Sequence, residues 1–506
     1  MVSAETKNIR YFIIASLAVL ALLVFSNLGN QYLWQDEAEN AVIAGNILKF
    51  GYPKAFDGTL LVISDIGYRP GYTWIFQPWL QNYVTAGSFL IFGKSTYSAR
   101  FPFALFGVLS FLVSYSLAKR LFSAKVARIS SVILMTSVPY LLMIRSARYY
   151  SLALFFSLIL IHGYLDYVEG RKYASFSIAA SSFLLFNSNF GMFFPLFTGL
   201  ALHRLIFYYS PKNLYRDLRL IVLVGLVTVP VFIYFKGWMH KVPLSADFVT
   251  GNIKFYLRSI NRYIAPIRFM AVVYVILSIW KRKFIFFKIN SQEKTNLSLI
   301  LFIFIVGVLF MGIAKFRSLR YIIYLIPLLI IFESYILARW MDYRRILPVA
   351  CIIVLITTDL LHHSLTTFLA KPVRSYLADY IYEITHDYDG PIEGIVKYLK
   401  QHAGKGDTVM ISYGDCAVSF YTGLKVDNRI DLFGKIYPDW FIYRDYWTPE
   451  EYLTRPDLTA KYTKIVLDYP DLRWENRPDD LGYHNFRTVK DCPKKVVIYR
   501  RKGSHD

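Results

Sequence analysis

Residues 11–28 read YFIIASLAVLALLVFSNL, an apolar run without a single charged side chain. The hydrocarbon core of a bilayer is about 30 Å thick, so a helix needs roughly 20 apolar residues to cross it. The run therefore predicts a transmembrane helix. Its length, and the lack of a small-residue cleavage site, argue against a removable signal peptide.

Ten further apolar runs follow, which makes eleven candidate spans in all. They centre on residues 101–118, 126–143, 147–165, 174–187, 190–209, 219–236, 263–280, 297–314, 321–338 and 346–361. The pair between 174 and 209 is the least regular, because Asn187 and Asn189 interrupt it. Composition agrees, since 55% of the residues are hydrophobic and only 18% are charged, against about 25% charged in soluble proteins. The fold class predicted is an α-helical polytopic membrane protein with about eleven transmembrane helices.

The basic residues predict the orientation, because cytoplasmic loops accumulate Lys and Arg. With Lys7 and Arg10 inside, alternate loops are all basic and all fall on one side. These loops carry Lys119, Arg120, Lys125 and Arg128; Arg171 and Lys172; Lys212, Arg216 and Arg219; Lys281, Arg282, Lys283, Lys288 and Lys294; and Arg339, Arg344 and Arg345. We therefore expect a plasma-membrane protein with a cytoplasmic N-terminus. An odd number of spans places the C-terminal residues outside the cytoplasm.

The formal charge of +22, from 57 Lys and Arg against 35 Asp and Glu, would also suit a nucleic-acid partner. Loops that face anionic lipid produce the same excess, and most of the cations lie in such loops. We expect membrane lipids and no nucleic acid as partners. Of the three cysteines, Cys351 falls in a span, whereas Cys416 and Cys492 lie outside and would pair only in an oxidising compartment. No spacing predicts a zinc site.

The chain divides into a transmembrane domain, residues 1–361, and a soluble extracytoplasmic α/β domain, residues 362–506. Two outside loops, 29–99 and 237–262, are too long to be simple connectors and are expected to be functional. In the C-terminal domain, residues 391–402 predict a helix with Pro391 early in it. Residues 408–412, 464–468 and 495–499 predict strands.

The first outside loop opens with Trp34-Gln35-Asp36-Glu37-Ala38-Glu39, which begins a helix predicted to run from Asp36 to Phe50. A carboxylate here could take a proton from a hydroxyl nucleophile. The same residues also fit a capping box, with Asp36 as the N-cap and Glu39 three residues on. Spacing alone favours capping, and the two roles are compatible within one loop.

Residues 70–93 of the same loop are apolar but broken by Pro78, and they predict an interfacial helix with Trp74, Trp79 and Tyr83 at headgroup level. Arg69 precedes this segment. Its forked guanidinium could bind a phosphate in a bidentate manner. The alternative is that Arg69 reaches to lipid headgroups.

Several other cations lie at the outer ends of spans, where cations are depleted. They are Arg145 and Arg148, Lys315, Arg317 and Arg320, and Arg258 and Arg262. An anionic ligand held at the membrane surface would explain such clusters. Pairing with Asp36, Glu37 or Glu39 would explain them equally well.

The order of these motifs resembles the GT-C membrane glycosyltransferases, the superfamily of protein O-mannosyltransferases and the lipid A aminoarabinose transferase. The resemblance is carried by Asp36-Glu37 after the first span, RPGYTW at 69–74 and FGKSTYSARFPFALFGVLS at 92–110. Ala147-Arg148-Tyr149-Tyr150 and the stretch from Arg320-Tyr321 to Pro327 extend it to about residue 340.

The resemblance implies a GT-C type fold and transfer of a sugar from a polyprenyl-phosphate donor at the outer face. It places Asp36 as the catalytic base, with Glu37 as the next candidate. The expected phosphate-binding residues are Arg69, Arg317 and Arg320, followed by Arg148, Arg258 and Arg262. The expected lining of the substrate and lipid cavity is Tyr68, Tyr72, Trp74, Tyr150 and Tyr321.

Two departures from the family pattern concern the site. Tyr68 stands where the aminoarabinose transferases have a metal-linked acid, and Tyr150 stands where some relatives have a second Asp. No cofactor or metal ligand set is therefore assigned, and a divalent metal is left open. The function predicted is an inverting glycosyltransferase with a lipid, glycan or protein acceptor. The alternative is a transporter or flippase for a lipid-linked sugar, although the chain lacks the two related halves typical of transporters.

Overall fold

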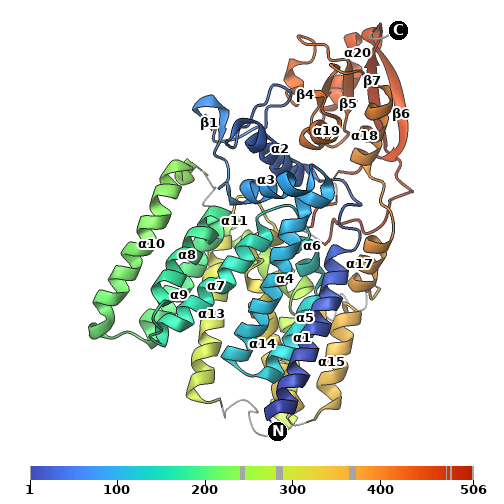
Figure 1. Cartoon of the computed structure of the whole chain (residues 1–506). Helices are drawn as coiled ribbons and strands as arrows, with labels where there is room; N and C mark the ends of the chain where they lie inside the picture. Colours follow the sequence, from blue (N-terminus) through green and yellow to red (C-terminus); the bar gives the residue numbers. More distant parts are fainter. Residues whose placement is uncertain are drawn as a thin grey trace.

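The computed structural model describes residues 2–239, 245–280, 289–342, 344–363, 372–473, 476–478 and 481–503. Long helices form a bundle, and the C-terminal residues form a sheet with its own helices at one end of it (Figure 1). The N-terminus lies at the opposite end of the bundle (Figure 1). The basic loop residues at 281–283 and 288, used above to predict the orientation, lie outside the described residues.

A helix, or in one case a bent pair of helices, lies at each of the eleven predicted spans. They are α1 (Val2–Phe25), α4 (Thr96–Leu121), α5 (Ala124–Thr136) with α6 (Val138–Ile144), α7 (Tyr150–Val168), α8 (Ala174–Ser188), α9 (Phe190–Phe207), α10 (Leu214–Tyr234), α12 (Ile267–Trp280), α13 (Ser291–Met311), α14 (Leu325–Met341) and α15 (Ile346–Thr357). Among the described residues, six helices are long and apolar enough to cross a membrane, or seven if the α5–α6 pair, bent by 67°, counts as one span. The chain is therefore a multi-pass membrane protein, and the count of eleven stays a prediction.

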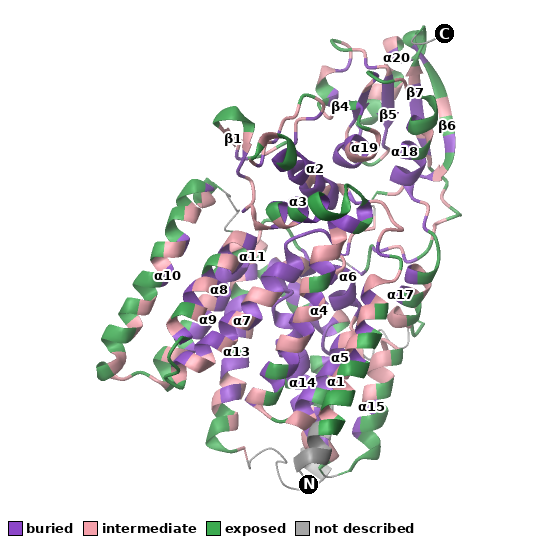
Figure 2. Cartoon of the chain, viewed as in Figure 1, coloured by how far each residue is buried: buried purple, intermediate pink, exposed green. Residues whose placement is uncertain are grey.

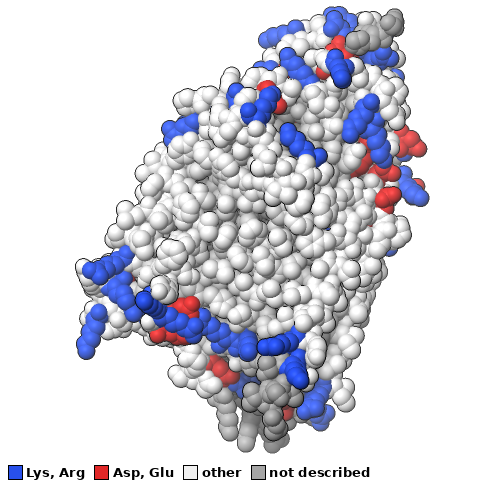
Figure 3. Space-filling view, viewed as in Figure 1, with Lys and Arg blue, Asp and Glu red and all other residues white. Residues whose placement is uncertain are grey.

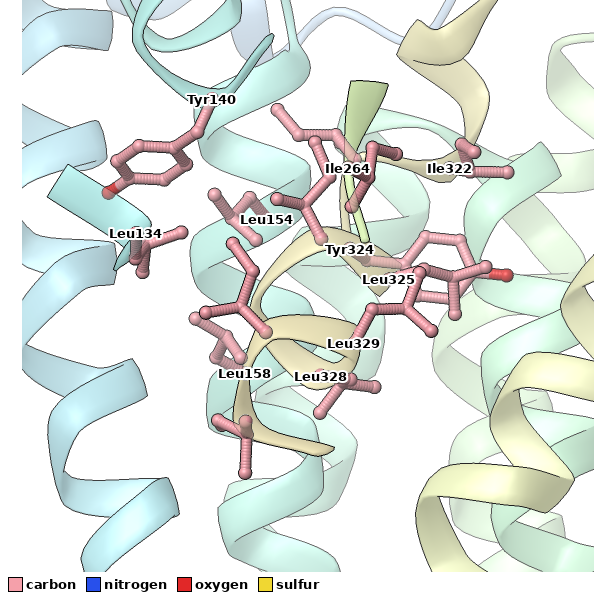
Figure 4. Packing of buried hydrophobic residues seen from close by; sticks show 14 of the residues in the cluster. Leu134, Tyr140, Leu154, Leu158, Ile264, Ile322, Tyr324, Leu325, Leu328 and Leu329 are labelled. Carbon is pink, nitrogen blue, oxygen red and sulfur yellow. The ribbon is translucent and has the colours of Figure 1, made fainter. Parts of the chain in front are cut away.

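The centre of the bundle is packed from aliphatic and aromatic side chains of α5, α6, α7 and α14, among them Leu134, Leu154 and Leu328 (Figure 4). Tyr140 of α6 is fully buried and donates its hydroxyl to the Gly107 carbonyl of α4 at 2.7 Å. A Cβ at Gly107 would lie 2.5 Å from the Cβ of Ile144. Glycine is therefore required for the close approach of α4 and α6.

The outer surface of the bundle fits a lipid environment. Leu22, Leu226 and Ile346 are 67–87% exposed although they are apolar, and α10 is exposed along most of its length (Figure 2). On the face shown in Figure 3, a broad uncharged belt lies between Lys and Arg side chains at the N-terminal end and charged residues near the C-terminal sheet. This distribution agrees with the predicted orientation, which remains a prediction.

The first outside loop covers the end of the bundle nearest the sheet. Its helix α2 (Gln35–Phe50) matches the prediction to within one residue and is buried through most of its length between the bundle and the C-terminal part (Figure 2). The interfacial helix predicted at 70–93 is wrong in extent, because within this stretch only α3 (Leu80–Phe92) is an α-helix. Before it, Pro70 and Gly71, whose φ is 72°, turn a short hairpin between β1 (Tyr68–Arg69) and β2 (Thr73–Trp74). Trp74 is buried at 1% exposure and is not at a surface.

The C-terminal residues form a five-stranded mixed sheet in the order β4-β3-β5-β7-β6. Its strands are β3 (Thr408–Ile411), β4 (Lys425–Asp427), β5 (Trp440–Tyr443), β6 (Tyr462–Pro470) and β7 (Lys495–Arg501), accompanied by α18 (Pro391–His402), α19 (Asp415–Thr422) and α20 (Pro456–Lys461). The predicted helix and the three predicted strands are present, whereas the short β4 and β5 were not predicted. The limits 1–361 and 362–506 remain predictions. Cys416 and Cys492 are both free thiols, so the pairing considered for them is not formed.

The predicted orientation can be tested by labelling single cysteines in a variant that lacks the three native ones. Lys49, Lys212 and Lys435 are exposed positions on α2, before α10 and in the C-terminal part. We expect an impermeant thiol reagent to label Lys49→Cys and Lys435→Cys in intact cells, and Lys212→Cys only after permeabilisation. Labelling of Lys212→Cys in intact cells, or protection of Lys435→Cys, would contradict the orientation.

Candidate functional site

A cavity of about 1500 Å³ lies where α2, the adjacent ends of the bundle helices and the C-terminal part meet. It exceeds the roughly 300–1,000 Å³ of ordinary small-molecule pockets. Its acids are Asp36, Glu39 and Asp65, and its cations are Arg148, Lys315, Arg317, Arg320, Arg473 and Arg477. Its aromatic lining includes Phe190, Phe194, Phe232, Phe255 and Phe310. The lining therefore combines six cations and three acids with many aromatic side chains.

Asp36 faces this cavity from the first turn of α2. The helix begins at Gln35, with Trp34 in the N-cap position and no side-chain cap bond. The capping box predicted for Asp36 and Glu39 is therefore wrong, because Asp36 lies inside the first turn. Its Oδ2 instead accepts a hydrogen bond from Nη1 of Arg320 at 2.8 Å, from a residue 284 positions away.

The guanidinium of Arg148 holds the acidic turn in place. Arg148 lies at the corner between α6 and α7, and its side chain is only 2% exposed. Its Nη1 donates to the Asp36 backbone carbonyl at 2.7 Å and to Glu39 Oε1 at 3.1 Å, and its Nη2 donates to Gln77 Oε1 at 2.9 Å. Burial opposes its charge, but Asp36 and Glu39 outweigh this effect and raise the pKa of Arg148 above its usual value.

Glu39 is the second carboxyl group paired with Arg148, and the sequence analysis did not select it as a catalytic or binding residue. Burial, with a smaller contribution from the negative charge of Asp36, raises the pKa of Glu39 to about 7, against the opposing effect of Arg148. The proton of Glu39 is therefore exchanged near neutral pH, next to Asp36. The signal available in the sequence was its place in the acidic run 36–39, where helix periodicity puts it one turn from Asp36.

Glu37 points away from the large cavity. It is 1% exposed, and it accepts from Nε and Nη2 of Arg100 at 2.9 and 2.6 Å and from the Ala147 backbone N–H at 2.6 Å. Arg100 comes from α4, whose first turn is capped by Ser95. The Glu37–Arg100 pair therefore fastens α2 to α4 and to the corner before Arg148.

Of the other residues predicted from the sequence, Arg317 and Tyr321 also line the cavity with Asp36, Arg148 and Arg320. Arg317 donates from Nε to Asn252 Oδ1 at 2.8 Å on α11 (Ala246–Tyr263). A Cβ at Gly251 would lie 2.8 Å from Arg317 Nη2, so glycine there leaves room for the guanidinium. No carboxylate pairs with Arg317 among the residues that the structure describes.

The remaining predicted residues are not among the described residues that line this cavity; they are Arg69, Arg258, Arg262, Tyr68, Tyr72, Trp74 and Tyr150. Arg69 donates to the Tyr234 carbonyl at 3.0 Å and lies 5.1 Å from the centre of that ring, which links the hairpin to the end of α10. Arg258 and Arg262 are exposed on α11. Tyr150 is fully buried beside Tyr149 at the start of α7.

The part of the chain that the structure describes holds no set of ligands for a divalent metal. Tyr68 donates its hydroxyl to the Val62 carbonyl at 2.7 Å and is absent from the cavity lining. Among the described residues, no group of three or more His, Cys, Asp or Glu side chains could hold a metal ion. The residues present do not fit a metal at the position that the aminoarabinose transferases use.

The C-terminal part supplies a second wall of the cavity, which the sequence did not predict. Trp447, Arg473, Arg477 and Tyr483 line it. The Trp447 ring stacks on Tyr413 with centroids 4.2 Å apart and planes 5° from parallel, and its Nε1 donates to the Arg473 carbonyl at 2.9 Å. These two contacts orient the indole at the cavity edge.

The C-terminal part also contacts α2 directly beside Asp36. Gln35 Nε2 donates to Asp415 Oδ1 at 2.7 Å, and Asn428 Nδ2 donates to the other oxygen at 2.7 Å. The Leu33 backbone N–H donates to the Tyr421 hydroxyl at 2.8 Å. The first turn of α2 is therefore held from both sides, by Arg148 below and by α19 above.

Comparisons with known proteins agree with this arrangement. Residues 77–235 match the family model of the dolichyl-phosphate-mannose-protein mannosyltransferases. ArnT from Cupriavidus metallidurans in the apo state superposes with a TM-score of 0.60 at 14% identity, over 98% of both chains. The structure of the same protein bound to undecaprenyl phosphate superposes with a TM-score of 0.56 at 15% identity, also over 98% of both chains.

The archaeal oligosaccharyltransferase AglB from Archaeoglobus fulgidus, in complex with an inhibitory peptide and a dolichol-phosphate, gives a TM-score of 0.53 at 12% identity, over 83% of this chain and 64% of AglB. No curated protein sequence matches the chain significantly. The chain has the fold of the GT-C glycosyltransferases, which confirms the resemblance found in the sequence.

The role of Arg148 can be tested by Arg148→Met, which keeps an extended side chain but removes the buried charge. We expect the free energy of unfolding to fall by roughly 3–5 kcal/mol, because Asp36 and Glu39 lose their buried partner. The measurement is thermal unfolding of the purified protein in detergent. Arg145→Met is the matched control, since Arg145 bonds to the Leu23 carbonyl and the Tyr380 hydroxyl and pairs with no described carboxylate.

The double variant Arg148→Met/Glu39→Gln separates charge from packing. The double variant should recover part of the stability lost in Arg148→Met. The reason is that Gln at position 39 is neutral and needs no guanidinium partner. An Arg148→Met variant as stable as the Arg145→Met control would show that the ion pairs do not hold α2.

Proposed function

We propose that this protein is a glycosyltransferase that moves a sugar from a polyprenyl-phosphate donor to an acceptor hydroxyl at the extracytoplasmic side of the membrane. The observation that carries the proposal is the meeting of Asp36 with Arg148, Arg317 and Arg320 in a large cavity that phenylalanines also line. Such a cavity suits a ligand with a phosphate at one end and an apolar chain at the other. ArnT and AglB, which share the fold, have been solved with undecaprenyl phosphate and a dolichol-phosphate.

Arg317 and Arg320 are the proposed donor-phosphate residues. Arg320 is paired with Asp36, and Arg317 is held by the neutral Asn252 and keeps an unbalanced positive charge. A forked guanidinium matches the oxygens of a phosphate. Arg69, Arg258 and Arg262 are not proposed for this role, because they do not line the cavity.

Asp36 is the proposed general base. The acceptor hydroxyl oxygen attacks the anomeric carbon of the donor from the face opposite the phosphate, which inverts the configuration. Its proton passes to the Asp36 carboxylate, while the bond from the anomeric carbon to the phosphate oxygen breaks and its electron pair stays on the phosphate. Arg317 and Arg320 then stabilise a charge that is larger in the transition state than in the ground state.

The Asp36–Arg320 contact suggests an order of binding. Arg320 Nη1 donates to Asp36 Oδ2 at 2.8 Å. A donor phosphate beside Arg320 competes for the same N–H groups and weakens its hold on Asp36. Binding of the donor would therefore free the base for the acceptor hydroxyl. Glu37 is proposed as a structural residue, because Arg100 and the Ala147 N–H occupy its oxygens.

The wall formed by Trp447, Arg473, Arg477 and Tyr483 is the proposed acceptor side of the cavity. It faces the acid and arginine cluster from the C-terminal part. Its aromatic and arginine side chains suit a lipid, glycan or protein acceptor.

The role of Asp36 is tested by comparing Asp36→Asn with Asp36→Ala. Asn keeps the size of the side chain but cannot accept a proton near neutral pH. We expect Asp36→Asn to bind the donor lipid and to lose about 10²–10⁴-fold in transfer rate, the usual contribution of a general base. Transfer is measured with membranes as the source of donor and acceptor. A near-native rate for Asp36→Asn would exclude Asp36 as the base, and Glu39 would be tested next.

The phosphate site is tested by single Gln and Lys variants of Arg317 and Arg320. Gln should weaken retention of undecaprenyl phosphate, and Lys should restore it only in part, because the forked geometry is lost. Arg69→Gln is the control outside the cavity and should retain the lipid. Equal retention by all the variants would contradict the proposed phosphate site.

A further inference from the structure

A second polar cavity lies within the bundle, apart from the one that contains Asp36. Its volume is about 60 Å³, room for roughly four water-sized groups. It lies at the bend between α5 and α6, against α14, the ends of α11 and α15, and α17 (Tyr376–Thr385). No residue that lines it lines the large cavity.

The feature that calls for a ligand is Glu333 of α14. Its side chain is 2% exposed, and neither carboxyl oxygen has a hydrogen-bond partner among the described residues. A buried acid without a partner costs free energy, and an ionisable residue within a membrane span is usually functional. Glu333 therefore needs a donor, and the cavity it lines is the place from which one can come.

The other polar groups of the cavity define what that donor is. The hydroxyls of Thr136 and Ser137 lie at the helix bend. Thr136 donates its proton to the Val132 and Ile133 carbonyls, so its lone pairs remain as acceptors. The Ser137 hydroxyl caps no N–H of α6. The second acid of the cavity, Asp359, already contacts the Arg374 N–H at 2.8 Å and His363 Nε2 at 3.1 Å. The Glu333 carboxylate and the two hydroxyls at the bend therefore form an acceptor set for a group with several N–H donors, such as a primary ammonium.

A cation completes the site on its exposed side. Arg262, at the end of α11, lines the same cavity and pairs with no carboxylate in the part of the chain that the structure describes. It interacts with the hydroxyl of Tyr376 on α17. An acid inside and an arginine at the exposed side suit a ligand with an ammonium and an anionic group a few atoms apart.

We propose that this cavity binds the headgroup of an aminophospholipid, with its ammonium at Glu333 and its phosphate at Arg262. In such a headgroup only two carbons separate the phosphate oxygen from the nitrogen, and Glu333 and Arg262 line one cavity of about 60 Å³. The surroundings favour a lipid over a free phosphoamine. The cavity is bounded by Ile133, Leu355 and Ile356 of the bundle, and α15 exposes apolar side chains, Ile353 among them at 55%, for acyl chains to cover. The site is independent of the proposed transferase reaction.

The test is native mass spectrometry of the full-length protein with equal amounts of phosphatidylethanolamine, phosphatidylcholine and phosphatidylglycerol. Wild type should retain phosphatidylethanolamine roughly tenfold or more over the other two, as expected for a charged hydrogen bond. Phosphatidylcholine has no ammonium N–H, and phosphatidylglycerol has no ammonium. Glu333→Gln should remove the preference, and Arg262→Gln should weaken retention of the lipid. Arg258→Gln, one turn away on α11 and outside the cavity, is the matched control.

Equal retention of the three lipids by wild type would overturn the proposal and leave a cavity filled only by water. The same holds if Glu333→Gln keeps the preference. The wild-type comparison decides the question even if a variant fails to fold. A separate arm with free O-phosphoethanolamine identifies the source, because binding of this compound without any preference for phosphatidylethanolamine would overturn the assignment to a lipid.

Discussion

The rest of the site depends on the contacts that the buried guanidinium of Arg148 makes with the first turn of α2. A charge with 2% exposure needs hydrogen-bond acceptors and a balancing charge. Here the Asp36 carbonyl, Glu39 and Gln77 accept from the two Nη groups, and the Asp36 and Glu39 carboxylates balance the charge. The requirement works in both directions, because the acids of α2 need a cation as much as Arg148 needs acids. It fixes the first turn of α2 against the corner between α6 and α7. Glu37, the residue after Asp36, is balanced in the same way by an ion pair with Arg100.

These ion pairs explain how a loop outside the bundle can hold a side chain in a defined position. Asp36 is held by Arg148 from the bundle and by Arg320 from the 3-10 turn Leu319–Ile322 before α14. Through its neighbour Gln35, it is also held by Asp415 from the C-terminal part. Three distant parts of the chain thus converge on one turn of helix. The cavity beside this turn is lined by both charged side chains and phenylalanines, a combination that suits a lipid phosphate.

The sequence predicts the features that depend on local patterns. Apolar runs located a helix at each predicted span, and the acidic start of α2 was placed to within one residue, because length and periodicity are local properties. What it could not supply were contacts across the chain. Asp36 pairs with a residue 284 positions away, so the sequence could not decide between capping and pairing. Arg69 and Arg317 look alike in sequence, yet only Arg317 reaches the cavity. Trp447 and Arg473 were missed because neither lies in a motif and their position depends on how the C-terminal part packs on α2.

The central claim is that the Asp36 cluster binds a lipid phosphate in the large cavity. The most direct test is an experimental structure of the protein with undecaprenyl phosphate. We expect the phosphate oxygens within about 2.7–3.2 Å of the guanidinium groups of Arg317 and Arg320, the chain along the phenylalanine lining, and the Asp36 carboxylate turned from Arg320 toward the open cavity. A phosphate bound elsewhere, with the Asp36–Arg320 pair intact, would contradict the claim.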